Sequence, residues 1–264
     1  MNTLEIFEKR LKQKNYSPRT IKAYVFYLKR FLMAQQKSPS HITFGDITKY
    51  LLNQEYSSTS QQNQIIGALK LYAKYMLNRS NLHIDKIERP RREKKLPMVL
   101  DGPTTEKNIK AIENLKHRCL LTVLFSGALR VSELLNIKLG DIDRHRMVIK
   151  INLGKGAKDR IVPVSQETLK LIEQYYRKYR PVEYLFNGQK SLKYTASSVN
   201  KLVKRHLHKD ASAHTLRHTC ATYLHEKGVD IATISKFLGH SNVKTTMVYL
   251  KISNKVIQRL PIPM

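Results

Sequence analysis

A basic stretch that contains two prolines lies before the middle of the chain and limits how the chain can fold. The residues 86-KIERPRREKKLPMVL-100 are rich in lysine and arginine, and Pro90 and Pro97 interrupt any continuous helix. At 264 residues, the chain is long enough for two ordinary domains. We therefore interpret the stretch as a linker and predict a domain over 1–88, a linker over 89–100 and a second domain over 101–264.

Before the linker, apolar residues recur only at helical spacing. Between Ile21 and Leu32 they return every three or four residues, and Ser17-Pro18 is a typical helix start. Two further helices are predicted over 44–54 and 58–78. We expect a helical bundle in this part of the chain.

After the linker, helical patterns surround a β-hairpin pattern. Apolar and polar residues alternate over 146–153, and the alternation resumes over 160–165 after a glycine-containing turn. The fold class we predict is mainly α with a small antiparallel β-sheet (α+β). Gly228 and Gly239 stand at expected helix ends. The helices are predicted over 104–125, 130–138, 166–178, 196–208, 214–226, 230–238 and 242–250.

The charge of the chain points to a polyanionic partner. Lysine and arginine total 48 against 20 aspartate and glutamate residues, which gives a formal net charge of +28. Such an excess of one sign is self-repulsive unless a polyanion neutralises it, and nucleic acid is the leading candidate. With 41% hydrophobic residues, the chain can build real cores, which argues against a disordered basic tail.

Several other classes of protein are excluded by the sequence. The apolar run 119-CLLTVLFSGAL-129 is too short to cross a bilayer, and the first residues contain no apolar signal core, so we expect a cytoplasmic protein with no membrane partner. Cys119 and Cys220 cannot form a disulfide framework or a four-thiolate zinc site, and we interpret both as core residues. The text GKGAKDR lacks the spacing of a nucleotide-binding loop, which makes an ATP-driven motor improbable.

Six side chains suit the attack of a hydroxyl on a phosphodiester without a metal. Arg130 and Arg217 can hold the non-bridging oxygens, because a guanidinium is always charged and can bond in a bidentate manner. Tyr249 can be the nucleophile, since a phenol with a pKa near 10 leaves again more easily than an aliphatic alcohol. His214 and Lys155 can act as base and acid, and His240 can donate to a phosphoryl oxygen.

A second group of residues suits contact with the DNA backbone. Lysine and arginine position a protein on phosphates without reading the bases. For any single residue a solvated surface charge is the alternative, and the linker can equally be an ordinary connector. The residues predicted to bind DNA are Arg19, Thr20, Lys22, Lys70, Lys74, Arg91, Arg92, Lys158 and Arg160.

The motifs together resemble the tyrosine recombinase (phage integrase) family, nearest to its Xer-type and simple integrase members. The resemblance lies in ALRVSEL, GKGAKDRIVPV, HTLRHT, LGH and Tyr249, and residues 17-SPRTIKAYVFYLKRF-31 resemble the opening of the family's core-binding domain. It covers essentially the whole chain. The family differs at one position, since it has glycine where this chain has Ala128.

This resemblance implies a site-specific recombinase that forms a 3′-phosphotyrosyl bond through Tyr249. It implies a pocket of Arg130, Lys155, His214, Arg217 and His240, with Glu133 as a supporting residue and His218 as a structural one. Lys158 competes with Lys155, which we prefer because it follows Gly154 as in the family pattern. The family also implies that no metal, ATP or other cofactor takes part.

The resemblance further implies a two-domain clamp around duplex DNA with paired core sites. We expect a monomer in solution and a homotetramer on DNA; the sequence does not identify accessory proteins. Residues 251–264 include Val256, Ile257 and Leu260, which can pack on their own domain or on a neighbouring protomer.

Two alternative functions remain open at this point. One is relaxation of DNA by a type IB topoisomerase-like enzyme, and the other is a non-catalytic DNA-binding protein of the same fold. A metal-dependent nuclease is disfavoured, because the acidic residues are dispersed and HExxH is absent. The sequence does not reveal the target site, the order of strand exchange, or whether the reaction resolves chromosome dimers or moves a mobile element.

Overall fold

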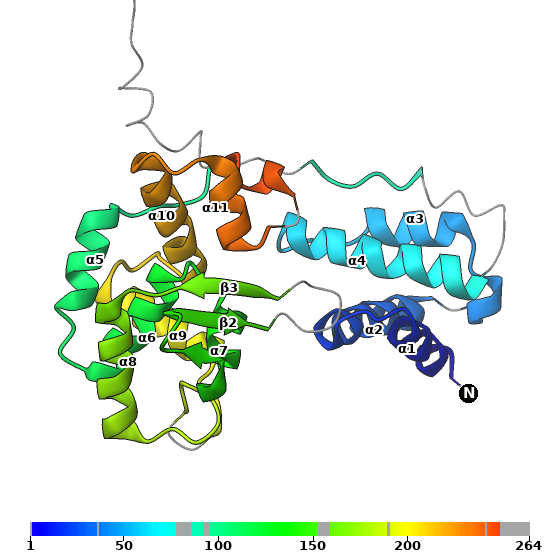
Figure 1. Cartoon of the computed structure of the whole chain (residues 1–264). Helices are drawn as coiled ribbons and strands as arrows, with labels where there is room; N and C mark the ends of the chain where they lie inside the picture. The colour runs from blue at the N-terminus through cyan, green and yellow to red at the C-terminus, as the bar shows by residue number, and fades with distance from the viewer. Residues whose placement is uncertain are drawn as a thin grey trace, which may run out of the picture. The chain divides into compact units, whose positions relative to one another are not determined.

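A computed structural model describes residues 2–35, 37–77, 86–91, 96–152, 159–188, 191–240 and 242–248. The chain divides into two compact units, Met1–Lys94 and Lys95–Met264, and Figure 1 labels their α-helices and the strands β2 and β3. The boundary between the units falls inside the stretch that the sequence predicts as a linker.

The described part of the N-terminal unit is helical, as predicted. Each of its four α-helices begins after a side chain that caps the first turn, and Ser17 with Pro18 starts the second one as expected. A short 3₁₀ turn, Pro39–His41, lies between the second and third, and a π-helical turn, Ala73–Leu77, extends the fourth. The helices are α1 Thr3–Gln13, α2 Pro18–Ala34, α3 Phe44–Leu52 and α4 Thr59–Tyr72.

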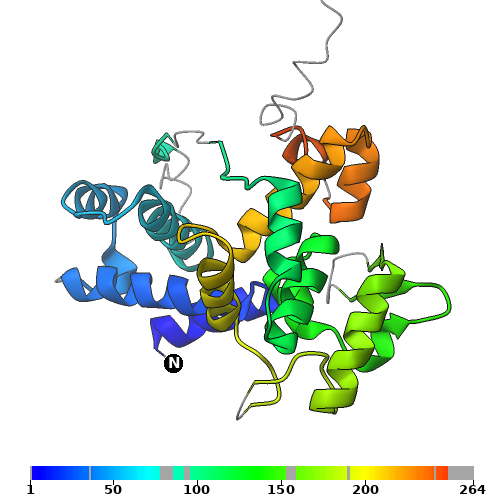
Figure 2. The same cartoon turned by 90° about the vertical axis from the view of Figure 1, so that its left-hand side faces the viewer.

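The core of this unit forms where α2 crosses α4. Figure 1 shows α4 along its length and α2 nearly end-on, and the turned view in Figure 2 shows the reverse. Phe31 and Tyr72 meet edge to face in this core, with ring centroids 6.4 Å apart. The Tyr72 hydroxyl donates to the Pro39 carbonyl at 3.1 Å, and burial raises its pKa to about 12.

The described part of the C-terminal unit combines helices with one small sheet. A 3₁₀ turn, Leu139–Asp141, precedes the sheet, and another, Val243–Thr245, follows the last α-helix. The elements are α5 Gly102–Lys110, α6 Leu115–Ser126, α7 Val131–Asn136, β1 Ile142–Asp143, β2 Val148–Ile151, β3 Arg160–Pro163, α8 Gln166–Tyr179, α9 Ala196–His206, α10 Ala213–Glu226 and α11 Ile231–Leu238.

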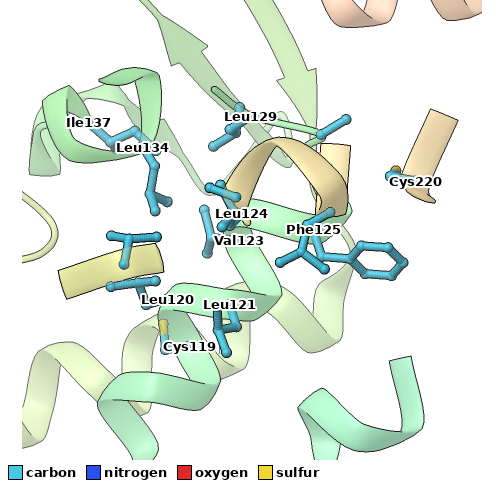
Figure 3. Packing of buried hydrophobic residues seen from close by; sticks show 14 of the residues in the cluster. Cys119, Leu120, Leu121, Val123, Leu124, Phe125, Leu129, Leu134, Ile137 and Cys220 are labelled. Carbon is cyan, nitrogen blue, oxygen red and sulfur yellow. The ribbon is translucent and has the colours of Figure 1, made fainter. Parts of the chain in front are cut away.

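Helix α6 is the centre of the C-terminal core. It packs against α5, α7, α8 and α10, and Figure 3 shows its labelled side chains projecting to several sides of the helix. A helix that is apolar around most of its circumference is stable only when other elements surround it. Cys119 and Cys220 are both buried, as predicted, and burial raises the pKa of the Cys220 thiol to about 12.

The predicted β-hairpin is confirmed. Strands β2 and β3 pair antiparallel, with Ile149 opposite Val162, and both of these side chains are buried. The two-residue strand β1 pairs with β2 on the other side and completes the sheet order β1-β2-β3. A strand of two residues gives no alternating pattern, so the sequence does not predict it.

Two predicted helical regions differ in the structure. The region 104–125 contains a break between α5 and α6, where Asn114 ends the interruption by accepting a hydrogen bond from the His117 N–H at 3.0 Å. The region 242–250 begins with a 3₁₀ turn rather than an α-helix, and Tyr249 lies outside the described residues.

Candidate active site

A buried carboxylate, Glu133, contacts three arginine side chains in the C-terminal unit. Its Oε1 lies 2.6 Å from Nη1 of Arg130 and 2.9 Å from Nη1 of Arg160. Its Oε2 accepts a hydrogen bond of 3.0 Å from Nη2 of Arg160 and lies 3.6 Å from Nη1 of Arg217. One carboxylate thus contacts three guanidinium groups, so the cluster has an excess of positive charge.

The charge of Glu133 itself is stabilised by these contacts. Burial on its own raises the pKa of this carboxyl, but hydrogen bonds from Arg160 and from the Arg130 backbone outweigh it and lower the pKa. The carboxylate therefore stays ionised at neutral pH and can act as a fixed anchor for the guanidinium groups.

Arg130 is the most accessible of the three arginines. It occupies the N-cap position of α7, and its backbone N–H donates to Oε2 of Glu133 at 2.8 Å. Its side chain is 39% exposed, against 8% for Arg160 and 1% for Arg217. An incoming anion can thus reach Arg130 while Glu133 fixes the orientation of its guanidinium.

Arg217 on α10 is held by two backbone carbonyls. Its Nη1 donates to the Ala128 carbonyl at 2.7 Å, and its Nη2 donates to the Leu238 carbonyl at 2.6 Å. These acceptors come from the turn before α7 and from the end of α11. Because the N–H groups of a guanidinium are arranged in a rigid planar fork, these two bonds fix the orientation of the group.

The turn that supplies one of these carbonyls has an unusual backbone. Ala128 has a φ of 43°, in the left-handed region that glycine enters without steric penalty. This gives a physical reason for the glycine of the family pattern at this position. The alanine is fully buried, and its strained conformation directs the carbonyl toward Arg217.

Arg160 has a different position from the one the sequence suggested. It was predicted to contact the DNA backbone, but its side chain is almost fully buried against Glu133, and its Nε donates to the Phe237 carbonyl at 2.9 Å. Its guanidinium is therefore occupied within the protein. The sequence did not indicate this burial, because an arginine directly after a basic hairpin turn cannot be distinguished by sequence from a surface residue.

Two histidines of α10 lie on one face of the helix. The rings of His214 and His218 are 4.3 Å apart between centroids, and His214 is the exposed member of the pair. Partial desolvation, with Arg217 and Arg130 nearby, lowers the pKa of His214. Desolvation and the neighbouring His214 lower the pKa of His218 to about 4.

His240 directly follows the end of α11. Gly239 ends that helix with a φ of 65°, and a Cβ at this glycine would come within 2.9 Å of Cδ of Arg160. Desolvation, followed by the charges of Arg217 and Arg130, lowers the pKa of His240 to about 4. Its Nδ1 lies 2.8 Å from Oγ1 of Thr246. Thr246 is buried, and no sequence motif distinguishes it.

The structure therefore brings together part of the predicted pocket. Arg130, Glu133 and Arg217 are in direct contact, while His214 and His240 lie close enough for their charges to be coupled to those arginines. Lys155, Lys158, Tyr249 and Arg92 lie outside the described residues, as does the predicted packing segment with Val256, Ile257 and Leu260.

The predicted DNA-binding residues of the N-terminal unit are mostly exposed. Arg19, Lys22 and Lys74 are at the surface, and Lys70 is half-buried. The Thr20 hydroxyl lies 2.7 Å from that of Ser17 at the start of α2, so it takes part in the helix cap. Arg91, in the linker stretch, is also exposed.

The described residues contain neither a metal-binding cluster nor a helix that could span a membrane. Over the ranges that the structure describes, histidine, cysteine and acidic side chains form no group of three or more that could hold a metal ion. In the same ranges, every helix is too short or too polar to cross a membrane.

Comparison with protein families assigns both units. Residues 99–255 match the model described as phage integrase family, and residues 3–81 match the model described as phage integrase, N-terminal SAM-like domain. The chain belongs to the phage integrase family. The resemblance inferred from the motifs is thereby confirmed.

Individual relatives agree with this assignment. Tyrosine recombinase XerA of Pyrococcus horikoshii is 34% identical over 261 residues, covering 96% of this chain and 90% of that protein. The crystal structure of a XerA recombinase is 28% identical, covers 99% of both chains and has a TM-score of 0.57. A XerH recombinase bound to its difH substrate has a TM-score of 0.74 at 22% identity over 95% of this chain and 83% of that one, a likeness of fold.

Replacing Arg160 should destabilise the fold. Arg160→Met leaves the Phe237 carbonyl without its donor and removes one partner of a buried ion pair, so the free energy of unfolding should fall by about 3 kcal/mol. Arg144→Met is the matched control, because Arg144 pairs with Glu173 at 3.0 Å with its side chain 68% exposed. That variant should lose less than about 1 kcal/mol. If urea denaturation shows the same loss of unfolding free energy for both variants, the buried contacts of Arg160 do not stabilise the fold more than a surface ion pair does.

Stability should depend on pH through two partly buried histidines, His218 and His240. The pKa values of His218 and His240 are about 4 in the folded chain, against an ordinary value of 6.5. Between these values the unfolded chain binds protons that the folded chain does not, so the free energy of unfolding should fall as the pH is lowered from 6.5 toward 4. Urea denaturation at a series of pH values measures this slope. His218→Gln should make it shallower, and an unchanged slope would exclude His218 as a source.

Proposed function

We propose that the chain is a site-specific tyrosine recombinase that cleaves and rejoins duplex DNA through Tyr249 and exchanges strands between two sites. The observation that supports this most directly is the cluster in which Glu133 fixes Arg130 and Arg217 beside His214 and His240. Its excess positive charge suits a phosphodiester. The family membership and the Xer-type relatives support the same reaction.

The proposed reaction begins with Tyr249 as the nucleophile. Its phenolic oxygen attacks the scissile phosphorus and forms the 3′-phosphotyrosyl bond, while the bond from phosphorus to the 5′ oxygen breaks. The phenolic proton passes to a general base, for which we propose His214, and the departing 5′ oxygen receives a proton from Lys155. A 5′-hydroxyl of the partner strand then reverses these steps and releases Tyr249.

Arg130 and Arg217 would stabilise the charge that develops on the non-bridging oxygens. Both guanidinium groups are fixed before DNA arrives, one by a carboxylate and the other mainly by carbonyls, so little reorganisation is needed during the reaction. The low pKa of His240 favours its neutral form, which can donate a hydrogen bond to a phosphoryl oxygen. No metal, ATP or other cofactor is required in this scheme, because one phosphodiester is exchanged for another.

DNA binding would use the basic surface residues outside the pocket. Arg19, Lys22, Lys74 and Arg91 are exposed and have the charge to contact phosphates. We propose that the two domains clamp a core site, that the chain is a monomer in solution and that four protomers assemble on two paired sites. Such a DNA-acting protein would work in the cytoplasm.

The two alternative functions fit the family findings less well. A type IB topoisomerase-like function is not favoured, because the relatives that match over most of this chain are named tyrosine recombinases. A non-catalytic architectural protein would not need a carboxylate that orients arginines beside two histidines of lowered pKa.

The proposed reaction predicts a covalent protein–DNA adduct. The chain should be incubated with a pool of nicked duplex fragments from the genome that encodes it, because a nick near the cleavage site lets the short strand diffuse away and traps the adduct. Wild type should form a denaturation-resistant adduct and Tyr249→Phe should form none. Sequencing the attached DNA would also identify the target.

Tyr223→Phe is the matched control for this experiment. Tyr223 lies on α10 in the same unit, but its ring packs against Gly102, so this variant should retain the adduct. An adduct that persists in Tyr249→Phe would exclude Tyr249 as the nucleophile. Absence of any adduct with wild type across the pool would contradict the proposed function.

The salt dependence of DNA binding should identify the basic residues that contact phosphates outside the pocket. In the Tyr249→Phe background, the slope of log binding constant against log salt concentration on a duplex should fall by about one unit for each phosphate contact removed. Arg19→Gln and Lys22→Gln should each reduce the slope in this way. Lys12→Gln is the control, since Lys12 pairs with Glu8 at 2.6 Å on α1. If Arg19→Gln, Lys22→Gln and Lys12→Gln all leave the slope unchanged, α2 is not a DNA-binding surface.

A further inference from the structure

Thr246 has no role in the reaction described above, yet its side chain contacts His240 of the pocket. It is fully buried, and its Oγ1 is 2.8 Å from Nδ1 of His240. Its backbone N–H donates to the Val243 carbonyl at 2.8 Å, and the His240 N–H donates to the Ser235 carbonyl at 3.1 Å. Both ends of the hydroxyl–imidazole contact are therefore held by the backbone. Along the sequence, Thr246 precedes Tyr249 by three residues.

The contact matters because His240 is neutral at physiological pH. Desolvation and the charges of Arg217, Arg130, His214 and Arg160 all disfavour the protonated ring. A neutral imidazole carries one N–H and one unprotonated nitrogen, so the two possible tautomers present opposite hydrogen-bonding groups at Nε2. Only the tautomer with the proton on Nε2 can donate from that atom to an anionic phosphoryl oxygen.

The hydroxyl of Thr246 distinguishes between the two tautomers. If Nδ1 is unprotonated, it accepts the hydroxyl hydrogen, and both groups are satisfied. If Nδ1 carries the proton, it donates to Oγ1 and the hydroxyl hydrogen needs another acceptor. In the part of the chain that the structure describes, the hydroxyl has no second hydrogen-bond partner. A buried polar hydrogen without an acceptor is costly, which favours the first arrangement.

We propose that the Thr246 hydroxyl donates to Nδ1 of His240 and so sets this ring in the tautomer whose Nε2–H donates to the scissile phosphate. Thr246 is then a positioning residue that acts through His240 and does not itself touch DNA. The proposal rests on the proposed recombinase function. In this proposal Thr246 determines which nitrogen of His240 carries the proton, and it does not change the charge of the pocket.

The reaction rate tests this role with three variants. Thr246→Val keeps the β-branched shape but lacks the hydroxyl. Adduct formation on a nicked substrate should slow by about 10–100-fold, the size of effect known for histidine ligands of metals that lose their orienting partner. Thr246→Ser restores a hydroxyl and should recover most of the rate. Thr245→Val, at the exposed neighbouring threonine, should match wild type. The DNA dissociation constant should be the same in all four proteins.

The tautomer itself can be observed by NMR. In the Tyr249→Phe protein with ¹⁵N-labelled histidine bound to duplex DNA, the His240 ring should show a protonated Nε2 and an unprotonated Nδ1. The same measurement on the Thr246→Val version should show a mixture or the opposite tautomer. A His240 ring with its proton on Nδ1 in the threonine protein would overturn the proposal, whatever the rates are.

A double-mutant cycle separates this role from a structural one. In a His240→Ala background, Thr246→Val should slow adduct formation no further, because the residue acts only through the ring. A further slowing of similar size would mean that Thr246 supports the fold or another residue. If wild type forms the adduct and Thr246→Val forms it equally fast, this inference fails while the recombinase function stands. If wild type forms no adduct, the recombinase function fails first.

Discussion

The arrangement of the pocket depends on one carboxylate that three arginines share. Glu133 cannot neutralise Arg130, Arg160 and Arg217 together, so positive charge remains beside it after the chain has folded. Burying this many like charges is unfavourable unless each has a partner, and the carbonyls of Ala128, Leu238 and Phe237 supply the remaining acceptors. The low pKa values of the nearby histidines follow from burial together with this unbalanced charge.

The three arginines of the cluster differ in burial, and this difference gives them different roles. Arg160 and Arg217 connect elements that are far apart in sequence: β3 to the end of α11, and α10 to the turn before α7. Arg130 makes its contact within the first turn of its own helix and keeps an exposed side chain. Burial thus fixes the guanidinium groups of Arg160 and Arg217 in place, and Arg130 is the most accessible of the three to an anion. A lysine could not make several directed bonds of this kind from one planar group.

The sequence predicted the fold class, the hairpin and most helices because hydrophobic period and capping residues are local signals. It also selected Arg130, Glu133, Arg217, His214 and His240 as candidates, since each stands in a recognisable motif, and the structure places these residues close together. It did not indicate that Arg160 is buried, and it gave Thr246 no role, because their positions follow from packing between segments distant in sequence or from a turn that no pattern marks. Likewise, only the backbone conformation of Ala128 explains why a glycine suits that turn. Residues that act through tertiary contacts are those that single-sequence reasoning cannot assign.

Gly239, which precedes His240, is required by the fold and not by the reaction. A side chain at position 239 would be disfavoured twice, by the left-handed backbone and by the methylene of Arg160 against which the turn is packed. Both constraints belong to the scaffold and would persist in a chain that had lost its nucleophile. A glycine kept before the histidine in a chain of this family therefore reports that the turn is intact. An inactive descendant would retain the glycine for as long as it folded, so the pair alone does not certify a working enzyme.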